Sequence, residues 1–190
     1  MLEQPGKQIT GYEDILTARE SARIFTKRGA PAKAMLFVAD KLQASGAIGI
    51  KTVTGLLGIF PEIEPAGRVI VLHIASAFLL ASVVNPEITP DVPLMQGVAM
   101  LLNNINTDLR TRALKVLLAL REKAAPVQDY ALGCIRNADA QIRLGGAQLL
   151  RNLGTNCSRS IVKQIRQAVE KYPTDTEYCR LLQETEVLLA

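Results

Sequence analysis

The sequence predicts an all-α protein built from stacked antiparallel helical hairpins, an α-solenoid fragment, preceded by a helical bundle region. Almost half of its 190 residues are apolar (48%), yet only 4% are aromatic and Trp is absent. Such a Leu-, Ala-, Ile- and Val-based composition suits helix-on-helix packing better than strands. Apolar residues recur at helical spacing between breaks marked by Pro and Gly. In addition, the second half of the chain repeats part of its own pattern.

The N-terminal half predicts four helices after a loose arm at residues 1–10. In the first, Ile15, Ala18, Ala22 and Phe25 share one face, and Gly29 provides a stop signal shortly after it. A break with two prolines precedes the fourth helix. The expected helices cover 11–26, 31–45, 49–60 and 66–84.

The segment 69–84 is nearly all apolar. Its sixteen residues fall short of the ~20 that span a bilayer. A helix that is apolar on all sides is either a core helix or a membrane span. We favour a buried core helix and keep a membrane anchor as the alternative. His73, the only histidine, is expected to be buried and to donate to a backbone carbonyl.

Three prolines between residues 86 and 93 predict a linker. We place a boundary there, with an N-terminal helical region at 1–91 and a helical-repeat region at 92–190, which can also pack as a single domain. Short loops beyond it imply antiparallel neighbours. The helices expected there cover 93–104, 107–122, 125–137, 139–153, 158–172 and 175–189.

An internal repeat is the most informative feature of the sequence. The run that starts at Asn106 and ends in Leu109-Arg110 returns 33 residues later as Asp139 followed by Ile142-Arg143. Apolar positions behind each run also correspond. A period of this length is typical of stacked helical arrays, which offer extended binding surfaces. We therefore expect 107–122 and 139–153 to be equivalent helices.

From about residue 95 onward the chain resembles HEAT-like repeats, particularly the short variety. The motif comprises Asp139, Ile142-Arg143, Gly146-Ala147, Leu149, Leu150, Leu153 and Gly154. The resemblance implies that Asp and Arg side chains link adjacent repeats in a ladder. Asp139 and Arg143 carry over, whereas the earlier copy has Asn106 in place of the Asp. Arg180-Leu181 is a candidate for a third, degenerate copy.

The residues that catalysis and metal binding require are sparse. One histidine and three scattered cysteines, Cys134, Cys157 and Cys179, support neither a metal cluster nor a Cys-His or Ser-His-Asp site. No phosphate-binding glycine motif occurs, and Gly145-Gly146 lies in a helical pattern, where we expect close helix packing. We predict no enzyme activity, cofactor, metal or small-molecule substrate. Scattered thiols and the lack of a secretion signal predict a cytoplasmic protein.

Charge is unevenly spread along the chain, whose net charge is +4. Residues 110–171 hold twelve basic and four acidic residues. Arg159, Lys163 and Arg166 follow one helical stripe, and Arg151 is expected beside them. We predict that these four residues bind an acidic protein surface.

The predicted function is therefore that of a non-enzymatic adaptor or scaffold that binds a protein partner through a helical-repeat surface. A first alternative is a nucleic-acid-binding protein that contacts phosphates through residues 110–171. Tyr130 is the one stacking aromatic among residues 110–171, and this scarcity disfavours single-strand binding. The second alternative, a membrane-associated component of a larger assembly, depends on the segment 69–84, and we regard a membrane role as the weaker reading.

Overall fold

The computed structural model describes residues 18–190. This part of the chain contains ten α-helices, five short 3-10 helices and no strand. The α-helices are α1 (Ala18–Thr26), α2 (Ala32–Ala44), α3 (Ala47–Gly58), α4 (Pro65–Val84), α5 (Val92–Met100), α6 (Thr107–Leu120), α7 (Gln128–Cys134), α8 (Ala140–Leu153), α9 (Val162–Lys171) and α10 (Thr176–Leu189). The 3-10 helices are η1 (Phe60–Glu62), η2 (Leu101–Asn103), η3 (Arg121–Val127), η4 (Gly154–Asn156) and η5 (Arg159–Ile161). The N-terminal half of the helix expected at 11–26 lies outside the described residues.

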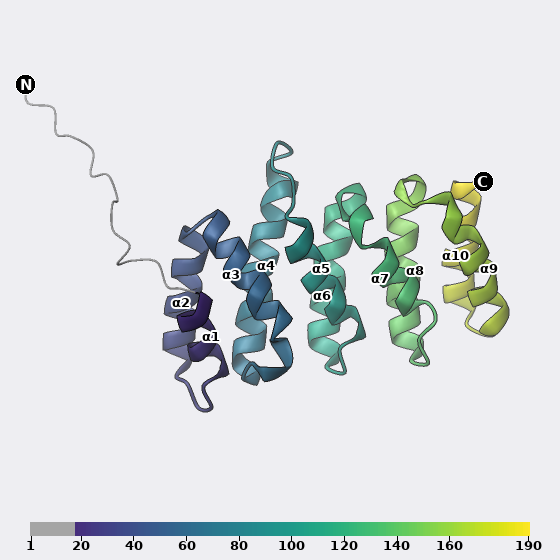
Figure 1. Ribbon diagram of the computed structural model, residues 1–190. Coiled ribbons are helices and arrows are strands. Elements are labelled where there is room, and N and C mark those ends of the chain that lie inside the picture. The colour runs from purple at the N-terminus through teal and green to yellow at the C-terminus, as the bar shows by residue number, and fades with distance from the viewer. Residues whose placement is uncertain (1–17) are drawn as a thin grey trace, which may run out of the picture.

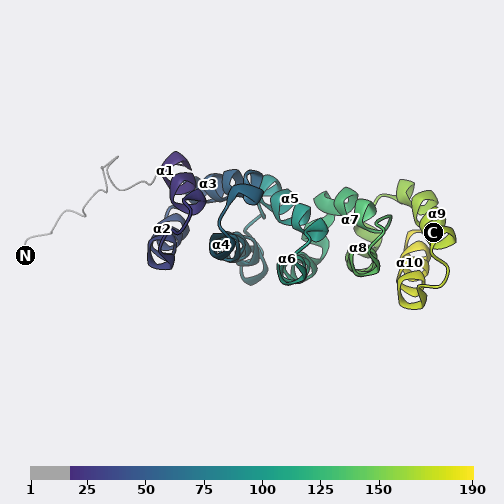
Figure 2. The same cartoon turned by 90° about the horizontal axis from the view of Figure 1, so that it is seen from below.

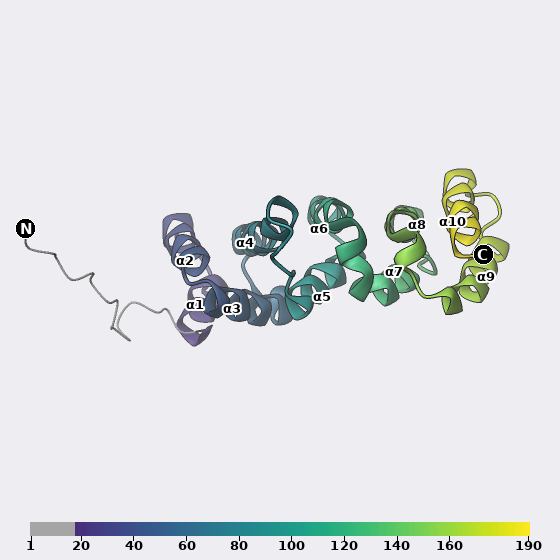
Figure 3. The ribbon, with the colours of Figure 1, turned by 90° about the horizontal axis from the view of Figure 1, so that it is seen from above.

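Consecutive helices form pairs that stack side by side into an elongated two-layer array (Figure 1). The odd-numbered helices form one layer and the even-numbered helices the other, as the views from below and above show (Figures 2 and 3). Each even-numbered helix packs against the next, from α2 to α10. The predicted all-α fold of stacked hairpins is confirmed, and the N-terminal helices continue the same two layers.

The apolar helix α4 lies between α2 and α6 in its layer and packs against α2, α3, α5 and α6. One face, which includes Val71, Ile74 and Leu79, is fully buried. The opposite face is exposed, so the helix is not buried all round as its composition predicted. His73 lies on that exposed face, and the expectation of a buried histidine is wrong. The reason is that α4 belongs to an outer layer and has neighbours on only three sides.

By length and composition, α4 is also the one helix in residues 18–190 that could cross a membrane. Of its most apolar 18-residue stretch, 39% is buried against the rest of the protein. The core helix of a soluble protein passes the same test.

Residues 85–91 of the proline-rich segment form the loop between α4 and α5, and one lysine ties this loop to the array. Lys123 Nζ donates to the carbonyl oxygens of Ser82, Pro86 and Ile88 at 2.7, 3.2 and 3.3 Å. Across this loop, α3 packs against α5 and α4 against α6. The helix packing therefore runs on past the segment where we placed a boundary.

Candidate partner-binding surface of the even-numbered helices

The even-numbered helices start at related points in the sequence. Asn106 and Asp139, 33 residues apart, cap α6 and α8, and each side chain accepts hydrogen bonds from the backbone N–H groups two and three residues further on. The same spacing separates Pro31 from Glu64, the residues that precede α2 and α4. Asp175 precedes α10. This register places equivalent side chains at equivalent heights along the stack.

Four residues after the caps of α6 and α8, two arginines link each helix to the next. Arg110 donates to the carbonyl of its own loop residue Asn104 (3.1 Å) and to Gln141 Oε1 in α8 (2.8 Å). Asp139, the cap of α8, lies 3.9 Å from the Arg110 guanidinium. These contacts join α6 to the start of α8.

Arg143 makes the same kind of link more strongly. Its guanidinium donates twice to Asp175, with Nε at 3.0 Å, and to the carbonyls of Asn137 and Ala138 at 2.9 and 2.7 Å. It also stacks 3.8 Å above the ring of Tyr172. The predicted pairing of Arg143 with an acidic neighbour is present, and it leaves this buried side chain unavailable to a partner.

The structure adds one arginine to this series and removes another. Arg68 occupies the same position in α4 and donates to the carbonyls of Ile63 (2.8 Å) and Pro61 (2.7 Å). The sequence offered only its place four residues after Glu64 as a signal. In α10 the equivalent residue is Cys179, whose thiol donates to the Tyr172 carbonyl, so the third copy proposed at Arg180 is one residue out of register.

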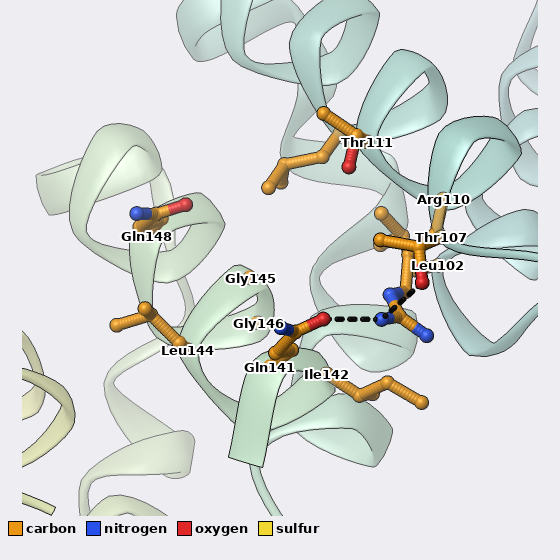
Figure 4. Close-up of a pocket in the computed structure, with 11 residues that line it drawn as sticks. Leu102, Thr107, Arg110, Thr111, Gln141, Ile142, Leu144, Gly145, Gly146 and Gln148 are labelled. Carbon is orange, nitrogen blue, oxygen red and sulfur yellow. Dashed lines mark hydrogen bonds between the residues drawn. The ribbon is translucent and has the colours of Figure 1, made fainter. Parts of the chain in front are cut away.

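Between α6 and α8 the outward face of the even layer opens into a groove of about 380 Å³ (Figure 4). Leu102, Leu114 and Leu144 line its apolar part. Thr111 and Gln148 also line it, and their side chains have no hydrogen-bond partner among residues 18–190. Unpaired amide and hydroxyl groups beside aliphatic carbon are suited to an extended peptide, because they can pair with its backbone while its side chains pack below.

Glycine keeps this groove open. A Cβ at Gly145 would lie 3.3 Å from Leu114 Cδ2, and a longer side chain would fill the space between the helices. The neighbouring Gly146 has a different role, since a Cβ there would meet Cys134 Cβ at 2.7 Å and the Ala131 carbonyl at 2.8 Å. Close packing, which we expected for both glycines, applies to Gly146 against α7.

A second, smaller groove of about 190 Å³ lies between α4 and α6. Val69, Leu72 and Val116 give it apolar walls, and Ser76 lies at its side. Three basic side chains also line it, and no acidic residue does. The lining basic residues are His73 of α4 and Arg112 and Lys115 of α6.

The four residues predicted to bind an acidic partner do not form one free patch. Arg151 donates to Glu184 and Arg166 to Glu186, both at 2.7 Å, so α10 compensates two of the charges. Arg151 and Arg180 together hold the pKa of the Glu184 carboxyl below its usual range. Arg159 in η5 and Lys163 in α9 are exposed, on the odd-numbered side of the array.

The three cysteines are buried and free. Burial raises the pKa of Cys134 and of Cys157 from 9.0 to about 11, which leaves both as unreactive thiols at neutral pH. Within the described residues, no three His, Cys, Asp or Glu side chains come together in a way that could hold a metal ion.

Comparisons of the chain with protein-family models, with curated proteins and with solved structures found no match. The surface of the array is therefore the guide to its function.

Proposed function

We propose that this protein is a non-enzymatic, HEAT-like adaptor or scaffold of the cytoplasm that binds an extended segment of a protein partner across the even-numbered helices. The α6/α8 groove carries the proposal. It is open to the outside, it has an aliphatic floor, and its free Thr111 and Gln148 side chains can pair with a peptide backbone.

The way in which the array is held together supports this use of its outer face. Arg110 and Arg143 make contacts between successive helices. These contacts fix the surface of the array in the absence of a partner. A preformed surface avoids much of the ordering cost of binding. Nucleic acid is the weaker candidate, since α10 compensates Arg151 and Arg166 and no Phe, Tyr or Trp lines either groove.

A peptide library displayed on phage tests the proposal, followed by fluorescence anisotropy with the selected peptides. We expect one family of extended sequences with an aliphatic residue in common. Gly145→Leu should weaken their binding at least ~10-fold, because the leucine occupies the groove.

Gly133→Leu is the matched control. Gly133 is an exposed helical glycine in α7, and nothing lies within 4 Å of a Cβ built there. Thermal unfolding of both variants verifies that they fold. Equal loss of binding in both, or none in Gly145→Leu, would contradict the proposal.

A further inference from the structure

The α4/α6 groove combines apolar walls with basic side chains. On the basis of the proposed function, we propose that the bound segment carries an aspartate or glutamate that docks in this groove, about three residues from the aliphatic side chain in the α6/α8 groove.

Two of the three basic side chains of this groove are uncompensated. Lys115 and His73 are exposed, and neither has a hydrogen-bond or ion-pair partner among residues 18–190. Arg112 donates through Nε to Asp108 at 2.8 Å, an exposed contact one turn away on the same helix. The rest of its guanidinium fork has no such partner and can bind a carboxylate. Lys115 and His73 differ in this respect from Arg151 and Arg166, which the protein pairs with its own glutamates.

The size and walls of the groove favour a peptide side chain over a nucleic acid. Its volume of about 190 Å³ is half that of the α6/α8 groove. Val69, Leu72 and Val116 suit the methylene groups of an acidic residue, and the basic side chains of the same lining suit its carboxylate. Nucleic-acid binding normally requires a longer track of cations, since each phosphate contact adds little alone.

The spacing follows from the stack. Neighbouring packed helices lie roughly 8–10 Å apart. On α6, the α4/α6 groove is lined by residues 112–116 and the α6/α8 groove by residues 107–114, so the two are offset by only a few residues along the helix. An extended segment in the polyproline II conformation advances about 3.1 Å per residue and returns its side chains to the same face at every third residue. A segment that crosses α6 therefore covers the distance in about three residues.

The test uses synthetic nine-residue peptides with a central leucine, in which a single aspartate or its neutral analogue asparagine is placed at each other position in turn. Affinity is measured by fluorescence anisotropy. We expect aspartate to improve binding about tenfold when it lies three residues from the leucine on one side, and less elsewhere. The advantage should shrink in 0.5 M salt, roughly as screening requires.

Lys115→Glu should abolish the preference for aspartate over asparagine, and Lys115→Gln should reduce it, while both retain binding of the asparagine peptide. Lys51→Glu, at an exposed lysine of α3 in the other layer, should change nothing. Circular dichroism verifies the fold of each variant.

The outcomes separate the two proposals. Leucine-dependent binding that Gly145→Leu weakens, without any preference for aspartate, would overturn the acidic site and leave the peptide groove standing. Absence of binding by every peptide would overturn both. If a 20-nucleotide oligothymidylate binds and Lys115→Glu abolishes that binding, the α4/α6 groove binds phosphate groups, and the proposal of an acidic peptide residue in it is wrong.

Discussion

The helix pair α7–α8 repeats the pair α5–α6 after 33 residues, yet each pair is joined to the next even-numbered helix in a different way. Arg143 meets the carboxylate of Asp175 and a tyrosine ring. Arg110 meets chiefly the neutral amide of Gln141, with Asp139 at 3.9 Å. The same side chain at the same position thus makes a close ion pair in one case and a weaker hydrogen bond, from a charged donor to a neutral amide, in the other.

The link weakens further toward the N-terminus. Arg68 donates only to carbonyls of its own loop, so no arginine of this series joins α4 to α6. The same motif position therefore stabilises some helix junctions more than others, and the arginine link is strongest between α8 and α10. Both proposed grooves lie on α6, where the junctions are weaker.

The largest expected effect tests this gradient directly. Arg143→Ala should lower the free energy of unfolding by about 3–5 kcal/mol, because it leaves Asp175 and two loop carbonyls without their donor. Arg110→Ala should cost less, about 1–3 kcal/mol, since its main partner is a neutral amide. Urea unfolding followed by circular dichroism measures both. The comparison fails if Arg110→Ala is as costly as Arg143→Ala.

Alkaline pH should weaken the packing of α7–α8 and leave that of α5–α6 unchanged. Cys134 lies in α7 and Cys157 follows α8 closely, whereas α5–α6 has no cysteine. Their pKa values are raised by burial from 9.0 to about 11, so between these values the folded protein holds protons that the unfolded chain releases. Stability therefore falls as the pH rises from about 9 to 11, by roughly 2 kcal/mol for the pair at 1.36 kcal/mol per pKa unit after allowance for partial solvation.

Urea unfolding at intervals of pH measures this fall. The double variant Cys134→Ala/Cys157→Ala is less stable throughout, through lost packing, but its stability should depend less steeply on pH. Tyr178, whose pKa burial also raises, contributes the same slope to both proteins. Identical slopes would show that these thiols do not titrate as their burial requires.

The adjacent glycines of α8 separate packing between layers from the groove on the surface. Gly146→Ala should destabilise by about 1–2 kcal/mol, because backbone and Cys134 of α7 must move away from the new methyl group. The equivalent residue of α6 is already Ala113. Gly145→Ala meets only the movable end of Leu114 and should be neutral or stabilising by up to about 1 kcal/mol. Thermal unfolding distinguishes them, and a shift of the same sign and size in both would refute the distinction.

Much of the fold could be predicted from local signals. Apolar spacing and Pro or Gly breaks predicted most of the helices, and the repeat of Leu109-Arg110 at Ile142-Arg143 placed α6 and α8 in equivalent positions. The N-terminal pairs escaped notice because Pro31 and Glu64 do not resemble Asn106 or Asp139 as caps, although the 33-residue spacing is the same. His73 was misplaced because composition shows how apolar a helix is but not how many neighbours it has.

The candidate site was less accessible to prediction. Arg151 and Arg166 stand out as cations in the sequence, but their glutamate partners lie 33 and 20 residues away on α10. Lys115 carries no local signal at all. Its proposed role in binding a carboxylate requires His73 of α4 nearby and a groove lined by no acidic residue. Both conditions follow from how the helices stack.

The smallest expected effect concerns the turns that end the two helices. Arg121 after α6 and Gly154 after α8 have nearly the same backbone conformation, with φ of 52° and 53° and ψ of −131° and −128°. Glycine adopts this region freely, whereas a side chain makes it strained. Arg121→Gly should therefore stabilise the protein by about 1 kcal/mol, and Gly154→Ala should destabilise it by about as much or more.

Arg121→Ala is the control for the first change, because it removes the exposed guanidinium but keeps the Cβ that causes the strain. It should leave stability unchanged, as measured by urea unfolding. A Cβ at Gly154 would lie 3.5 Å from Leu188, an ordinary contact, so any cost there also arises in the backbone. If Arg121→Ala stabilises as much as Arg121→Gly, the arginine side chain and not its backbone is the unfavourable element. The two turns would then owe their common shape to the helices and not to the residue that occupies them.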